Sequence, residues 1–308
     1  MNIADRKAFD KSSRNGFFLD IFRGIAIGIA FIIPGFSGGS VAAILGIYER
    51  LVGAIADIFK DFLRSIKTLL PIGLGMIIGI FSLLYPLGWA LTAYPFPTVC
   101  LFVGLAVGGL PSITERLSGK VNYKNILAIS IPFLASAALS FLPVGGDVNL
   151  FELNFGGYLL LVLIGFVASA ALVVPGISGS MLMLIFGYYN PIVNMITHHL
   201  LHGKNVGASI LVLGATALGI GVGFIVISVI MKLLLRNYPR GTYFAILGFI
   251  LGSIPTIYVS TAKEAGYTVS TLPHSVWHSI FSVLLLLVGL TVSLLLVKLS
   301  RKLNKASN

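Results

Sequence analysis

Two glycine- and serine-rich segments interrupt otherwise apolar sequence, and their residue types are the ones in this chain best suited to binding a ligand. FIIPGFSGGSVAAILGIY, residues 31–48, returns 141 residues later as LVVPGISGSMLMLIFGYY, residues 172–189, with Pro, Gly, Ser and Gly in the same register. Proline cannot continue the hydrogen-bond ladder of a helix, and glycine adopts backbone conformations closed to other residues. Each segment is therefore expected to end one helix and begin another.

A helix that begins inside a membrane presents unpaired N–H groups and the positive end of its dipole, and both favour an anion. Serine hydroxyls at the same place are additional donors. The two breaks therefore predict a site for a phosphate or a carboxylate. The residues expected to form it are Gly35, Ser37, Gly38, Gly39, Ser40, Gly176, Ser178, Gly179 and Ser180. The alternative is that each break is only a kinked helix whose serines bond back to their own turn.

The composition places these breaks in a membrane. Of the 308 residues, 57% are hydrophobic and 10% are charged, and the mean hydropathy is +1.00, which is typical of a polytopic membrane protein. Six stretches approach the roughly 20 apolar residues that a crossing needs. They are 68–90, 98–114, 125–142, 206–231, 242–260 and 277–298. The stretches with the breaks, 18–48 and 157–190, are too long for one crossing and are predicted to be re-entrant hairpins of two half-length helices.

The positions of the basic residues support this topology. With the N-terminus in the cytoplasm, 19 of the 21 Lys and Arg residues fall on the cytoplasmic side, as the positive-inside rule requires. They form five clusters, namely the N-terminal tail with Arg23, then 50–67, 116–124, 232–240 and 298–305. If either hairpin crossed fully, every later loop would change sides and the bias would collapse. The net charge of +11 is thus expected to face anionic membrane lipids and not a nucleic acid.

A second repeat shows that the chain consists of two related halves. Residues 94–113 match residues 238–257 at an offset of 144, sharing Tyr, Pro, Thr, two Gly, Pro and Ile. After a cytoplasmic tail at 1–14, the halves are 15–150 and 151–308, each with one hairpin and three crossings. An odd number of crossings inverts the second half, so we predict an all-α membrane protein with an inverted-topology repeat and both termini in the cytoplasm. Such repeats are typical of secondary transporters.

Glycines four residues apart predict close contacts between helices in this design. The pairs are Gly75 with Gly79, Gly104 with Gly108, Gly219 with Gly223, and Gly248 with Gly252.

Three charged residues flank the first hairpin at the predicted cytoplasmic interface. Arg23 or Arg50 could receive a phosphate there, because a guanidinium matches phosphate oxygens with paired donors. Glu49 is the candidate for gating or coupling. The alternative is that the arginines are interfacial anchors and that Glu49 neutralises Arg50.

No cofactor is expected. No predicted crossing has Asp or Glu in its middle, so a buried proton relay lacks a candidate carboxylate. Coupling to H⁺ or Na⁺ stays open. No metal site is expected either, because His198 and His202, four residues apart, lack a nearby carboxylate as a third ligand.

The break segments also resemble a known family. RGIAIGIAFIIPGFSGGSVAAILGIYERL, residues 23–51, and ALVVPGISGSMLMLIFGYYNPIV, residues 171–193, are similar to the two signature segments of the PopT family of bacterial polyprenyl-phosphate transporters. The resemblance implies a multi-pass protein of the bacterial cytoplasmic membrane. It implies that the protein returns undecaprenyl phosphate from the outer to the cytoplasmic leaflet for cell-wall precursor synthesis. The chain departs from the family pattern at Phe31 and Asn190, where family members often carry acidic residues.

Three classes of function are compatible with two polar breaks in a membrane. A transporter or flippase for a lipid phosphate, working by alternating access between the two breaks, is the first. A secondary transporter or channel for a small soluble anion is the alternative. An intramembrane enzyme is the third, but the chain has no HExxH motif, no phosphate loop and no intramembrane nucleophile with a base. We therefore predict that the protein is not an enzyme.

Overall fold

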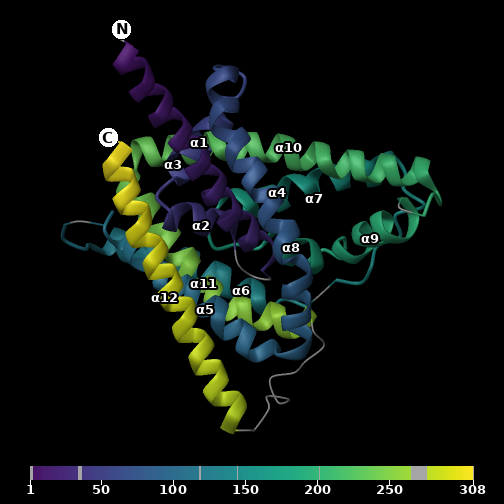
Figure 1. The fold of residues 1–308 in the computed structure, drawn as a ribbon. Coiled ribbons are helices and arrows are strands. Elements are labelled where there is room, and N and C mark those ends of the chain that lie inside the picture. Colours follow the sequence, from purple (N-terminus) through teal and green to yellow (C-terminus); the bar gives the residue numbers. More distant parts are fainter. Residues whose placement is uncertain are drawn as a thin grey trace.

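The computed structural model describes residues 3–33, 37–117, 119–143, 145–200, 202–264 and 276–307. In this part of the chain the regular structure is helical and no strand occurs (Figure 1), which confirms the all-α prediction. The elements are α1 (Ile3–Ile32), α2 (Gly38–Ile44), α3 (Tyr48–Ala56), α4 (Phe62–Ala93), α5 (Pro95–Thr114), α6 (Tyr123–Phe141), α7 (Phe155–Val173), α8 (Gly179–Ile185), α9 (Tyr189–Asn194), the π-helix η1 (Met195–Leu200), α10 (Val206–Asn237), α11 (Pro239–Glu264) and α12 (Val276–Ser307).

Six of the described helices are long and apolar enough to cross a membrane, so the chain is a multi-pass membrane protein. The stretches are Phe62–Ala93, Pro95–Thr114, Phe155–Val173, Val206–Asn237, Pro239–Val259 and Trp277–Lys302. Five coincide with predicted crossings. The sixth, in α7, was predicted as a half-length arm of a hairpin, whereas the crossing predicted at 125–142 corresponds to α6, whose apolar stretch Tyr123–Leu139 is shorter.

The prediction of two half-length helices around each break is wrong, because the arms are unequal. In each half one long helix, α1 or α7, leads to the break, and two short elements follow it. The short helices α2 and α8 both end at a glycine in the left-handed conformation, Gly46 with φ 68° and Gly187 with φ 76°. Left-handed backbone favours glycine and commonly terminates a helix. These two glycines lie 141 residues apart, so the repeat of the sequence extends to the turns.

Helix packing repeats between the halves as well. α1 packs against α4, and α7 packs against α10. α5 packs against α12 and α6 against α11, so each of these two pairs joins one helix from each half into a single body (Figure 1).

The predicted glycine contacts are confirmed, because all eight glycines face backbone or Cβ atoms of a neighbouring helix. A Cβ atom at Gly75 would lie 2.1 Å from the Ile21 carbonyl oxygen, and one at Gly219 would lie 2.0 Å from that of Val162. Only glycine allows backbones to approach this closely.

The five basic clusters gather at one end of the molecule, which we call the basic face. Contacts join them pairwise, namely Arg50 with Asp20, Arg116 with Glu49, Lys232 with Asp57, Arg301 with Glu115, and Arg240 with the Lys120 carbonyl oxygen. The start of α1 and the end of α12 are drawn toward the same end of the molecule in Figure 1. The charge bias of the sequence therefore corresponds to one surface of the fold.

Candidate functional site

The two breaks meet at one cavity of about 320 Å³. Ser37 from the first break lines it, together with Ser178, Gly179 and Ser180 from the second. Its apolar walls are formed by α1, α7 and α10, with Phe31 among them. Segments that are 141 residues apart in the sequence thus share one partly polar cavity inside an apolar protein.

Direct contacts hold the first break against the end of α7. The Tyr48 hydroxyl donates a hydrogen bond of 3.0 Å to the Val173 carbonyl oxygen, and a Cβ atom at Gly39 would lie 3.0 Å from that same oxygen. The Ser37 hydroxyl lies 3.5 Å from the Ala171 carbonyl oxygen.

The serines at the two breaks cap their own helices. Ser37 accepts a hydrogen bond of 3.2 Å from the Gly39 amide, and Ser178 accepts one of 3.4 Å from the Met181 amide. The Ser178 and Ser180 hydroxyls are 3.0 Å apart. The alternative prediction, that the serines bond back to their own turn, is therefore correct for Ser37 and Ser178. It does not exclude ligand binding, because the bond that Ser37 donates to the Ala171 carbonyl oxygen is long at 3.5 Å, and the contact between Ser178 and Ser180 uses only one of their two hydroxyl protons.

The short helices change the electrostatic argument. α2 and α8 have seven residues each, about two turns, so their dipoles are smaller than that of a long helix. Hydroxyl groups and the first backbone amides are therefore the groups at this cavity that can bind an anion.

Other predicted site residues lie beside the cavity and do not line it. The Phe31 ring covers Gly38, since a Cβ atom there would lie 2.5 Å from the ring. Gly176, at φ 88°, packs against the backbone of α11, and its carbonyl oxygen accepts a hydrogen bond of 3.0 Å from Ser136. Ser40 is fully buried, and its hydroxyl has no hydrogen-bond partner among the described residues. Gly35 lies outside the described residues.

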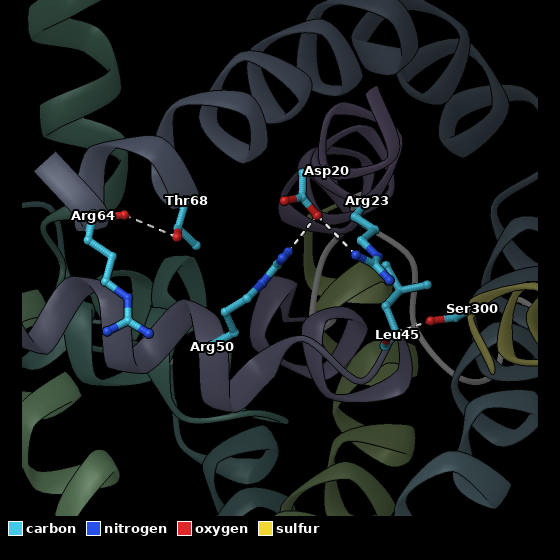
Figure 2. Close-up of polar contacts among 7 residues, drawn as sticks. All are labelled: Asp20, Arg23, Leu45, Arg50, Arg64, Thr68 and Ser300. Atoms are coloured by element: carbon cyan, nitrogen blue, oxygen red, sulfur yellow. Dashed lines mark hydrogen bonds and ion pairs between the residues drawn. The ribbon is translucent and has the colours of Figure 1, made fainter. Parts of the chain in front are cut away.

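The two candidate arginines pair with a residue that the sequence analysis did not single out. Asp20 lies between them in Figure 2, 3.0 Å from Arg23 and 2.5 Å from Arg50. Asp20 and Arg23 are each only 7% exposed. Arg23 and Ile33, which lines the cavity, are ten residues apart, about 15 Å along a helix, so this ion-pair cluster is separate from the cavity. The spacing of Asp20 and Arg23, three residues apart on a helix, was the signal in the sequence.

Glu49 pairs with residues other than Arg50, so the predicted neutralisation of Arg50 by Glu49 is wrong, whereas the role of the arginines as interfacial anchors stays a prediction. Glu49 accepts a hydrogen bond of 2.6 Å from the Tyr243 hydroxyl and pairs with Arg116 at 3.3 Å. Neighbours in sequence on a helix point in different directions, so Glu49 and Arg50 find separate partners. Glu49 thereby links α3 to α11, across the two halves.

A further contact across the halves supports the short helix α2. The Ser300 hydroxyl of α12 donates a hydrogen bond of 2.6 Å to the Leu45 carbonyl oxygen at the end of α2 (Figure 2). The final carbonyls of a helix lack partners within it, so this bond helps to fix α2 beside the cavity.

The chain is similar to proteins that are named as transporters. The chain is 29% identical over 292 residues to a Staphylococcus aureus protein named polyprenyl-phosphate transporter, covering 92% of this chain and 97% of that protein. It is 28% identical over 250 residues to a Vibrio cholerae protein of the same name, covering 77% and 76%. No solved structure matches the chain.

These relatives confirm the resemblance that the break segments carry, and their names describe transport and not an enzymatic reaction. Residues 27–272, most of the chain, match the family model described as undecaprenyl phosphate translocase-like. The chain therefore belongs to the undecaprenyl phosphate translocase-like family.

Proposed function

We propose that this protein is a flippase of the bacterial cytoplasmic membrane that returns undecaprenyl phosphate from the outer to the cytoplasmic leaflet for cell-wall precursor synthesis. The observation that carries the proposal is the cavity shared by the two breaks. The names of the relatives and of the family supply the class of substrate.

The cavity suits the phosphate of such a lipid. A phosphate charge is costly in the low-dielectric core of a bilayer unless polar groups replace its water. Hydroxyls of Ser37, Ser178 and Ser180 supply donors from two directions, and Gly179 leaves backbone accessible beside them. A volume of about 320 Å³ is large enough for the headgroup, and it lies at the low end of the range for ligand sites.

The way each hairpin closes on itself supports re-entrant topology. Arg50, after the first hairpin, contacts Asp20 near its beginning. After the second break, the Asn190 side chain donates a hydrogen bond of 3.2 Å to Asp147, and the Gly187 carbonyl oxygen accepts one of 3.1 Å from the Val148 amide. Each hairpin thus returns to where it began. With the basic face in the cytoplasm, the first hairpin enters from that side and the second from the other, as an inverted repeat requires.

Contacts across the two halves on the basic face are the proposed cytoplasmic gate. Glu49 with Tyr243, Asp57 with Lys232, and Glu115 with Arg301 each join a residue of the first half to one of the second. Alternating access to the cytoplasm requires these links to separate. Arg50 is then the residue that receives the phosphate, in exchange for Asp20.

Reconstitution into liposomes tests the proposal. Leaflet exchange of undecaprenyl phosphate should depend on the protein and should be lost when Ser37→Ala and Ser178→Ala are combined. Ser253→Ala is the matched control, because that buried hydroxyl bonds only to its own helix, at 2.8 Å. No exchange with the wild type would refute lipid transport, and full exchange in the double variant would refute the cavity as the phosphate site. Flux of inorganic phosphate or chloride through the same liposomes without lipid exchange would favour the small-anion alternative.

A further inference from the structure

An apolar groove of about 450 Å³ lies between α10 and α11, beside the second break. Val174 and Ile177 form one wall, α10 contributes Ile230 and Met231, and α11 contributes Ile246 and Phe249. The groove is separate from the cavity that the serines line.

One residue connects the groove to that cavity. Ile177 lines both spaces, and the next residue along the chain is Ser178, which caps α8 and faces the cavity. A molecule with a polar head in the cavity therefore has an apolar space directly beside it, on the other side of a single side chain.

The groove opens toward lipid. Ile230 is 45% exposed and Leu234 is 39% exposed, and both lie on α10, which is long and apolar enough to cross the membrane. The groove extends to the corner between α10 and α11, where Tyr238 lines it. Lys232 and Arg240 of the basic face flank this corner in the sequence, so the groove reaches the membrane surface on the basic side.

Two small residues leave room for the groove. Gly241 and Ala245 line it at the positions where the first half, 144 residues earlier, has Pro97 and Leu101. Leu101 packs against a core cluster that includes Phe102 and Val297. The second half has the same helix with smaller side chains and keeps a space there.

We propose that this groove holds the isoprenoid units of the substrate that adjoin its phosphate, at the step when the tail lies in the leaflet of the basic face. The inference rests on the proposed function. Because lipid chains are as apolar as leucine, a tail that moves from the bilayer into the groove gains little from the hydrophobic effect. The role of the groove is therefore to position the tail beside the occupied cavity and to favour tails whose shape fits the groove, and not to add hydrophobic binding energy.

Photo-crosslinking tests the location of the tail. Undecaprenyl phosphate that carries a diazirine in the isoprenoid unit next to the phosphate should label residues 227–249 in liposomes. Ala245→Leu, which introduces the residue of the first half, should greatly reduce that labelling and slow leaflet exchange. Ala217→Leu is the matched control, because Ala217 is exposed on α10, the other helix that borders the groove, and does not line the groove.

A smaller substitution at Ala245 distinguishes a blocked groove from a misfolded protein. In a Cys100→Ser background, Ala245→Cys should react with an apolar maleimide, and undecaprenyl phosphate should protect it, whereas inorganic phosphate should not. Equal protection by a phosphatidic acid would show a general lipid groove and overturn the isoprenoid assignment. Labelling outside the groove, or unchanged labelling in Ala245→Leu, would refute the groove. The proposed function would still stand if Ser37→Ala with Ser178→Ala abolished exchange.

Discussion

Replacing Asp20 by Asn should destabilise the protein far more than replacing Asp57 by Asn, although each change removes one carboxylate from the basic face. Asp20 is 7% exposed and contacts Arg23, which is equally buried, and Arg50. Asp57 pairs with Lys232 at a site where the two side chains are 34% and 41% exposed. The two positions therefore compare the same substitution in a buried and in a solvated ion pair.

The magnitudes follow from this difference in burial. Removing one partner of a buried ion pair costs about 3–5 kcal/mol, because the remaining charge stays in a poorly solvated place. Arg50 is 45% exposed and regains water, so we expect about 3 kcal/mol, arising mainly from Arg23. An exposed pair contributes about 0–1 kcal/mol. The gap of about 2 kcal/mol corresponds to roughly a 30-fold difference in the ratio of folded to unfolded protein.

Denaturant unfolding of the purified protein in detergent measures both losses, as a shift of the transition midpoint at constant slope. Adding Arg23→Gln to Asp20→Asn should recover part of the stability, because the buried positive charge is then removed as well. Equal losses for Asp20→Asn and Asp57→Asn would refute the claim that burial makes the Asp20 cluster special.

Four further substitutions have expected outcomes. Gly75→Ala places a methyl group 2.1 Å from a carbonyl oxygen of α1 and should cost about 1–3 kcal/mol of unfolding free energy. Gly73→Ala, with nothing within 4 Å, should be neutral or stabilise by up to about 1 kcal/mol in the same assay. Tyr48→Phe removes the hydrogen bond to the end of α7 and should cost about 1–2 kcal/mol and slow leaflet exchange; unchanged stability would contradict that role. Glu49→Gln weakens a link of the proposed gate and should increase labelling of Ser178→Cys from the cytoplasmic side, and unchanged labelling would argue against the gate.

The positions of charged residues made much of the fold predictable. Basic stretches that are far apart in the sequence contact one another on the basic face, as is expected if membrane insertion places such stretches on one side. The two glycine-rich breaks were equally visible, since proline and glycine interrupt helices wherever they occur together. The lengths of the helices on either side of each break were not predictable, because α7 is hydrophobic over its 19 residues and hydropathy alone does not show where the chain turns.

Partners across the fold were beyond reach from one sequence. Nothing in the residues of α5 and α12 shows that these helices pack together, because many apolar faces are interchangeable before the tertiary fold selects one. The contact between Glu49 and Tyr243 was equally unpredictable, since 194 residues separate the two. Asp20 differs, because its spacing from Arg23 on a helix already predicts their contact.

Helix capping and phosphate binding at the two breaks make different demands on the same hydroxyl, and this difference separates the two interpretations of the serines. Replacing a serine cap by alanine costs about 1 kcal/mol, whereas replacing it by glycine costs only a few tenths. If Ser178 only caps α8, then Ser178→Gly should keep both stability and leaflet exchange, and Ser178→Ala should lose some of each. If its hydroxyl also binds the phosphate, both variants should lose exchange to a similar degree while only the alanine variant loses stability. The proposed function predicts the second outcome, because Ser178 caps α8 and lines the same cavity as Ser37. If leaflet exchange fell only in the variant that also lost stability, the serines would act only as helix caps.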